Sequence, residues 1–131
     1  MTFTLQGSRR RTILLVDPDP QFRASLRILL ENAGFTVGEA ANGKEGERTA
    51  MRIRPDAIIA ELMLESVDAG SVVADRLRQM GEKFPIYLMS SASPSLRSDL
   101  NFTQLGIAGL FNKPFDPKVV IETLKARLNL S

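Results

Sequence analysis

Residues 55–64 read PDAIIAELML, a short apolar run that ends on the carboxylate of Glu61. The run at 57–60 lacks the polar and apolar alternation of a half-exposed strand, so it predicts a strand buried on both faces of a sheet. A second run of this kind, ILLV at residues 13–16, ends on Asp17. Buried strands of this type are typical of parallel sheets, in which ligands bind where the strands end.

Helical patterns alternate with these strands along the chain. Asp19-Pro20 and Asp116-Pro117 each place an N-cap before a proline at the first helical position. Asn42 with Glu45 resembles a capping box, and Gly34 is expected to end the first helix. Further strands are predicted at 35–37, 86–89 and 108–111, and further helices at about 69–82 and from 94 to 105. The side chains predicted to face inward include Phe22, Leu26, Leu29, Leu30, Val72, Val73, Leu77 and Met80.

Five such strand–helix units predict an α/β fold, a parallel sheet with helices on both faces. We expect residues 1–11 to form a flexible N-terminal arm and residues 12–131 to form one domain. The chain has no cysteine and no histidine, which excludes thiol catalysis, disulfides and the commonest general base. No run approaches the roughly 20 apolar residues of a membrane span, and a cytoplasmic location is expected from the lack of an export signal.

Four polar side chains stand where predicted strands end, and the motifs around them resemble those of response-regulator receiver domains. They are Asp17, Glu61, Ser90 and Lys113, in the motifs ILLVDPDP (13–20), ELML (61–64), PIYLMS (85–90) and NKPF (112–115). The resemblance runs from about Thr12 to Asn129. It implies a flavodoxin-like, doubly wound, five-stranded parallel sheet of order 2-1-3-4-5 with five helices.

The resemblance also implies a role for each of these residues. Glu61 stands at the phosphoacceptor position, where the family carries aspartate, and Asp17 with Asp19 would form the acidic pocket. Ser90 and Lys113 would be the phosphate contacts, with Ser90 reporting phosphorylation. The family's chemistry uses Mg²⁺, which prefers oxygen ligands such as carboxylates.

Several residues depart from the family pattern. Pro18 replaces a usual metal ligand, so we expect no bound cofactor, and Mg²⁺ at Asp17 and Glu61 is doubtful. Glu65 and Ala69 replace the common proline and glycine of the following loop, and Leu110 stands where many members carry a switch aromatic. These departures indicate an atypical member that lacks the acceptor aspartate.

Three interpretations of Glu61 stay open at the level of sequence. A live acceptor is disfavoured, because the extra methylene displaces the attacking oxygen by more than about 1 Å, enough to cost on the order of 100-fold in rate. A partial mimic of the phosphorylated state is one alternative, since one carboxylate carries less charge than the roughly −1.5 to −2 of a phosphate. A structural ion pair with Lys113 is the other.

The sequence therefore predicts a signalling module that is not an enzyme and acts by protein contact, without phosphorylation. The expected partner is a sensor kinase, an output protein or a second copy bound through about residues 95–129. No association with a membrane is expected. The alternative within the fold is a conventional Mg²⁺-dependent phosphoacceptor. A nucleic-acid binder using Arg9–Arg11 is a third class, which we disfavour because the net charge is only +2 and no basic helix supports it.

Overall fold

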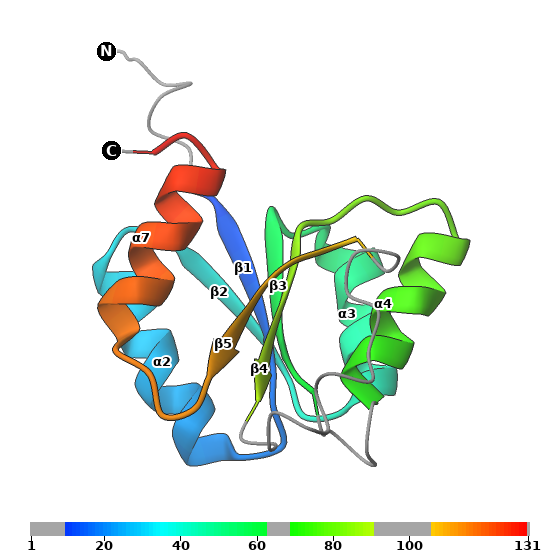
Figure 1. Cartoon of the computed structure of the whole chain (residues 1–131), viewed down its shortest axis with the longest axis horizontal. Helices are drawn as coiled ribbons and strands as arrows, with labels where there is room; N and C mark the ends of the chain where they lie inside the picture. Colours follow the sequence, from blue (N-terminus) through cyan, green and yellow to red (C-terminus); the bar gives the residue numbers. More distant parts are fainter. Residues whose placement is uncertain (1–9, 63–68, 91–105, 131) are drawn as a thin grey trace.

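Five parallel strands form one sheet in the order β2-β1-β3-β4-β5 (Figure 1). The structure, a computed structural model, describes residues 10–62, 69–90 and 106–130, with the backbone alone at 69–72. The strands are β1 (Thr12–Val16), β2 (Thr36–Ala40), β3 (Ala57–Glu61), β4 (Ile86–Ser90) and β5 (Ile107–Asn112). The predicted α/β class, flavodoxin-like topology and strand order are confirmed.

The helices cover both faces of this sheet (Figure 1). Four helices lie within the described residues: α2 (Pro20–Asn32), α3 (Gly43–Ile53), α4 (Ala69–Gln79) and α7 (Pro117–Arg127). α2 and α7 lie on one face, and α3 and α4 lie on the other. The predicted helix from 94 to 105 lies outside the described residues, so the fifth helix stays a prediction. Within the described part of the chain, no helix combines the length and apolarity needed to cross a membrane.

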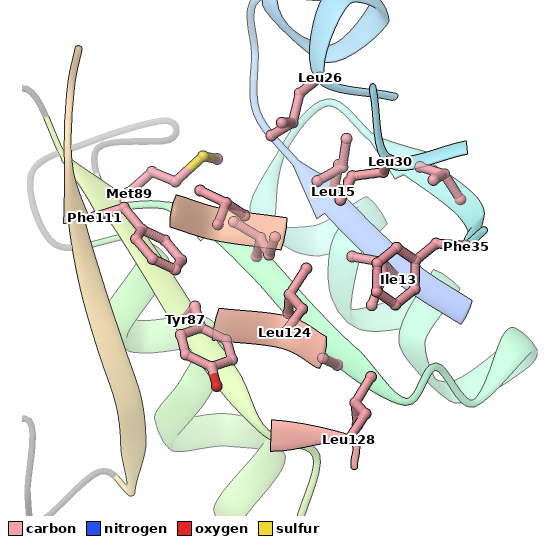
Figure 2. Packing of buried hydrophobic residues seen from close by; sticks show 14 residues of the cluster. Ile13, Leu15, Leu26, Leu30, Phe35, Tyr87, Met89, Phe111, Leu124 and Leu128 are labelled. Carbon is pink, nitrogen blue, oxygen red and sulfur yellow. The ribbon is translucent and has the colours of Figure 1, made fainter. Parts of the chain in front are cut away.

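The hydrophobic core consists of two clusters, one on each side of the sheet, because successive strand residues point to opposite faces. Ile13 and Leu15 of β1 pack in the cluster beneath α2 and α7, which Figure 2 shows from close by. Leu14 and Val16 pack in the other cluster, beneath α3 and α4. A Cβ on Gly46 would lie 3.0 Å from both Val16 methyl groups, so glycine lets α3 approach β1 closely. The central strands β1, β3 and β4 are thus buried on both faces, as their unbroken apolar runs predict, whereas the edge strands β2 and β5 are partly exposed.

The predicted helix N-caps are confirmed. Asp19 Oδ1 accepts a hydrogen bond from the Gln21 backbone N–H at 3.0 Å, and Asn42 Oδ1 accepts one from the Glu45 N–H at 2.8 Å. Asp116 caps α7 in the same way. These caps satisfy backbone donors that the first helical turn leaves without partners. They also fix where each helix leaves the sheet edge that carries the predicted site.

Two side chains predicted to face inward are exposed instead. Met80 is 46% exposed because α4 ends at Gln79 and the next residue lies in a turn. Leu29 is 40% exposed, on the side of α2 that does not pack on the sheet. The prediction that Met80 and Leu29 belong to the core is therefore wrong.

Arg10 and Arg11, just before β1, already form hydrogen bonds with the segment that leads into β2. The Arg10 guanidinium donates to the Phe35 carbonyl at 3.2 Å, and the Thr36 N–H donates to the Arg11 carbonyl at 2.9 Å. Residues 1–9 lie outside the described part, so the boundary of the N-terminal arm stays a prediction.

Candidate functional site

Three of the predicted site residues meet at the carboxyl edge of the sheet. Asp17 follows β1, Glu61 ends β3 and Lys113 follows β5. The Lys113 Nζ lies 2.8 Å from Asp17 Oδ2 and 2.7 Å from Glu61 Oε1. We call these three residues the charge triad. Asp17 is 1% and Glu61 5% exposed, so one ammonium group serves two buried carboxylates.

Asp17 is held from several directions besides the lysine. Its Oδ1 accepts a hydrogen bond from the Asp19 N–H at 2.8 Å, which ties the carboxylate to the start of α2. Its own N–H donates to the Ala40 carbonyl at 3.0 Å, and its carbonyl accepts a hydrogen bond from the Arg23 guanidinium. Both oxygens of the Asp17 side chain thus have donors within the protein.

Lys113 is charged at neutral pH in this setting. Burial alone would lower its pKa, but the hydrogen bonds and charges of Asp17 and Glu61 outweigh burial and raise the pKa above the usual 10.5. The Nζ also lies 4.0 Å from the centre of the Phe22 ring, a cation–π contact. The lysine is therefore held by two carboxylates and an aromatic face.

Ser90 and Asp19 lie near the triad in different settings. Ser90 is fully buried at the end of β4, and its carbonyl accepts a hydrogen bond from the Lys113 N–H at 2.8 Å. Asp19 is exposed and caps α2, as its sequence position before Pro20 favours. The reporter role of Ser90 and the place of Asp19 in an acidic pocket stay predictions. Leu110 is partly buried and packs on the cluster beneath α3 and α4.

Two residues around the triad were not predicted as part of the site. Helical spacing assigned Phe22 to the core. Its ring contact with Lys113 depends on the rotamers of both side chains, which the spacing does not specify. Arg23 carries no sequence signal for its bond to the Asp17 carbonyl, because an arginine on a helix is an ordinary surface residue. Their positions one turn into α2 are consistent with a site built around the end of β1.

Comparison with known proteins decides the family. The family model described as "Response regulator receiver domain" matches residues 13–125, most of the chain. The chain belongs to the response regulator receiver domain family. Receiver domains are signalling modules of two-component systems, and they act through sensor kinases and output domains.

Similar proteins include longer transcriptional regulators. This receiver domain is 33% identical over 117 residues to the "DNA-binding dual master transcriptional regulator RpaA" of Synechocystis, covering 88% of this chain and 48% of that protein. It is 32% identical over 121 residues to the "Alkaline phosphatase synthesis transcriptional regulatory protein PhoP" of Bacillus subtilis, covering 92% of this chain and 50% of that protein. The chain thus spans about half the length of these relatives.

Solved structures agree with the fold. The chemotaxis response regulator CheY4 of Vibrio cholerae matches with a TM-score of 0.78 and 26% identity, covering 90% of this chain and 98% of that chain. The N-terminal domain of the uncharacterized protein WS1339 from Wolinella succinogenes matches with a TM-score of 0.82 and 28% identity, covering 91% and 94%.

The side chains of this receiver domain do not fit the Mg²⁺ ion that the family resemblance implies. Pro18 offers no carboxylate and no N–H, and Lys113 places its own positive charge against both triad carboxylates. Among the described residues, no three acidic, histidine or cysteine side chains group closely enough to hold a metal. A divalent ion at Asp17 and Glu61 would share those two carboxylates with the positive charge of Lys113, which would repel it.

Proposed function

We propose that this receiver domain is an atypical signalling module that acts by binding partner proteins and does not use phosphorylation. The observation that carries the proposal is the position of Lys113, whose Nζ bonds Glu61 at 2.7 Å and Asp17 at 2.8 Å. In the family, by resemblance, this lysine contacts the phosphate. Here the carboxylate of Glu61 occupies it.

The same contacts argue against Glu61 as a nucleophile. To attack a phosphoryl donor, a carboxylate oxygen needs the right reach and a site that neutralises the incoming charge. Glu61 is one methylene longer than aspartate, and the lysine that would neutralise the donor already balances two carboxylates. The donor would therefore meet a site with a net charge of about −1 from these three groups, which repels an anion.

Intact-mass spectrometry after incubation with a small phosphodonor and Mg²⁺ tests the proposal. We expect no phosphate adduct on the wild-type protein. The matched control is the double variant Pro18→Asp/Glu61→Asp, which restores the family's acidic residues and should gain the mass of one phosphate. A stoichiometric adduct on Glu61 of the wild-type protein would overturn the proposal.

Within this proposal, Glu61 has one of two roles: it partly mimics a phosphate, or it forms a structural ion pair with Lys113. Glu61→Gln removes the charge of the side chain at nearly the same size. If Glu61 mimics the phosphorylated state, this variant should change partner affinity or oligomerisation. If neither changes while stability does, Glu61 is structural.

The partner is a protein, and the relatives indicate which classes to test first. RpaA and PhoP are named as transcriptional regulators, so an output domain or a sensor kinase is the first candidate, with a second copy through about residues 95–129 as the next. Residues 91–105 of that face lie outside the described part of the chain. We also propose a cytoplasmic location and a role without enzymatic activity, both on the sequence expectation.

A further inference from the structure

The exposed side of α3 carries three cations in a row. Lys44, Arg48 and Arg52 lie four residues apart, so they follow one line along the helix, with about 6 Å of rise from one to the next. All three are exposed, whereas Gly46 and Ala50 on the other side of the helix are buried. We call Lys44, Arg48 and Arg52 the α3 basic row.

The cations of the row form no ion pair or side-chain hydrogen bond with any of the residues that the structure describes. The two acids of α3 bond to other groups. Glu45 accepts a hydrogen bond from the Ala41 N–H at 2.6 Å. Glu47 pairs with the Arg76 guanidinium of α4 at 2.7 Å. The row therefore presents its positive charges to the solvent.

This arrangement lowers the stability of α3. Like charges four residues apart on a helix repel each other, and the row contains two such pairs, Lys44 with Arg48 and Arg48 with Arg52. Lys44 also lies in the first turn, where the helix dipole favours acidic side chains over cations. An anionic partner would relieve both costs, because it would place negative charge beside all three cations.

We propose that the α3 basic row binds an acidic segment of a partner protein. Acidic residues four apart on a partner helix, or two apart on an extended segment, repeat at about 6–7 Å, which matches the spacing of the row. Met51, three residues after Arg48, is 38% exposed and offers a flexible apolar contact beside the charges. The inference rests on the proposed function as a protein-binding module, and it names the chemistry of the partner.

The surroundings of the row favour a narrow protein segment over nucleic acid or a membrane. Neighbouring cations are neutralised, since Arg76 pairs with Glu47. Arg54, the C-cap of α3, pairs with Glu82 at 2.7 Å. The excess positive charge is thus confined to one row, whereas a nucleic-acid duplex or a bilayer presents negative charge over a wider area and would meet the exposed carboxylate of Asp75 on α4. The apolar side of α3 packs on the sheet, so it is not available to insert into a membrane.

Fluorescence anisotropy of labelled poly(L-glutamate) with the full chain tests this interface. The wild-type protein should bind the peptide, and added salt should weaken the binding, because the contact is between exposed charges. Arg48→Glu should lower the affinity by at least about tenfold, since it sets a like charge against the peptide, while Arg48→Lys should retain most of it. The matched control is Lys83→Glu, which makes the same kind of charge change at an exposed residue between α4 and β4 and should bind like the wild type.

Three results would overturn the proposal. The first is no binding by the wild type at low salt, and the second is an equal loss with Lys83→Glu, which would reveal an effect of net charge alone. The third comes from the same titration with single-stranded DNA or anionic vesicles, if either binds more tightly than the peptide and Arg48→Glu abolishes that binding. The phosphate-adduct experiment involves none of these cations, so the proposed function and this inference can fail separately.

Urea denaturation gives a second measurement that needs no partner. Arg48→Glu replaces the two repulsive pairs of the row with two attractive ones, so the midpoint of unfolding should rise while peptide binding falls. A lower midpoint would show that Arg48 stabilises the fold without a partner, and it would contradict the proposal.

Discussion

The charge triad and a surface cluster formed by Arg23, Arg27, Glu31 and Glu39 both join cations to carboxylates, but they differ in burial and in the ratio of charges. In the triad, one ammonium group serves two carboxylates, whose side chains are 2% and 7% exposed. In the surface cluster, the Glu39 carboxylate accepts two guanidinium groups, and its side chain is 26% exposed. The two sites thus place similar chemistry in different surroundings.

The difference shows where in this molecule an ion pair matters. A charge left without its partner in a buried site costs several kcal/mol, because protein replaces the water that would solvate it. At the surface, water and salt replace a lost partner, so the same deletion costs little. We therefore expect loss of an ion pair to reduce stability more in the triad than in the surface cluster.

Lys113→Met is expected to give the largest effect. It removes the lysine from the buried carboxylates of Asp17 and Glu61, and it should lower the free energy of unfolding by about 2–4 kcal/mol, somewhat less than for a fully buried pair because the lysine is partly exposed. Urea denaturation at neutral pH without divalent ions measures this loss. A loss no larger than that of Arg27→Ala in the surface cluster would show that burial does not strengthen the triad.

The contributions of the two sites to stability should depend on pH in opposite ways. The triad should lose its contribution at high pH, and Glu39 of the surface cluster should lose its contribution at low pH. The pKa of Lys113 is raised above 10.5 in the folded protein, so the triad's contribution is present below about pH 10.5 and is lost as the pH rises through the raised pKa. Hydrogen bonds from Arg27 and then Arg23 lower the pKa of Glu39 below 4.5, so its contribution is present above about pH 4.5 and is lost as the pH falls.

Denaturation of matched variants across pH measures both trends. The stability difference between wild type and Lys113→Met should shrink at strongly alkaline pH, and the difference between wild type and Glu39→Gln should shrink in acid. If the Lys113→Met difference instead stayed constant far above pH 10.5, the lysine would not stabilise the fold through its charge.

Arg27→Ala is expected to give the smallest effect. Its side chain is 41% exposed, and Arg23 continues to bond Glu39, so the free energy of unfolding should fall by about 1 kcal/mol at most. The loss should shrink further at high salt, because the ions screen exposed charges. Denaturation with and without added salt measures it, and a salt-independent loss above about 2 kcal/mol would place the surface cluster in the same class as the triad.

The sequence predicts the frame of the site well, because the strand signals are strong and parallel strands bring their carboxyl ends to one edge. The buried runs at 13–16 and 57–60 place Asp17 and Glu61 together, and Lys113 lies directly after β5 at the same edge. The helix starts were predictable because Asp19 and Asp116 are strong caps before proline. Local backbone chemistry determines each of these features.

Features that depend on side-chain packing were not predictable in this way. The ring of Phe22 lies against Lys113 because of how both side chains turn, and helical spacing assigned it simply to the core. Met80 was predicted as buried because the helix was expected to run to about residue 82, whereas α4 ends at Gln79, within the error of about 2–4 residues that predicted helix ends carry. Leu29 fits the inward stripe by spacing alone, yet it lies at the border of that stripe and reaches solvent.

The proposed function depends on the contact between the Glu61 carboxylate and the Lys113 ammonium group. Titration of Lys113 by NMR, in the wild-type protein and in Glu61→Gln, measures the strength of this contact. We expect a Lys113 pKa above 10.5 in the wild type and a clear fall in the variant, because one of its two charged partners is lost. An equal Lys113 pKa in both proteins would show that Glu61 does not hold the lysine.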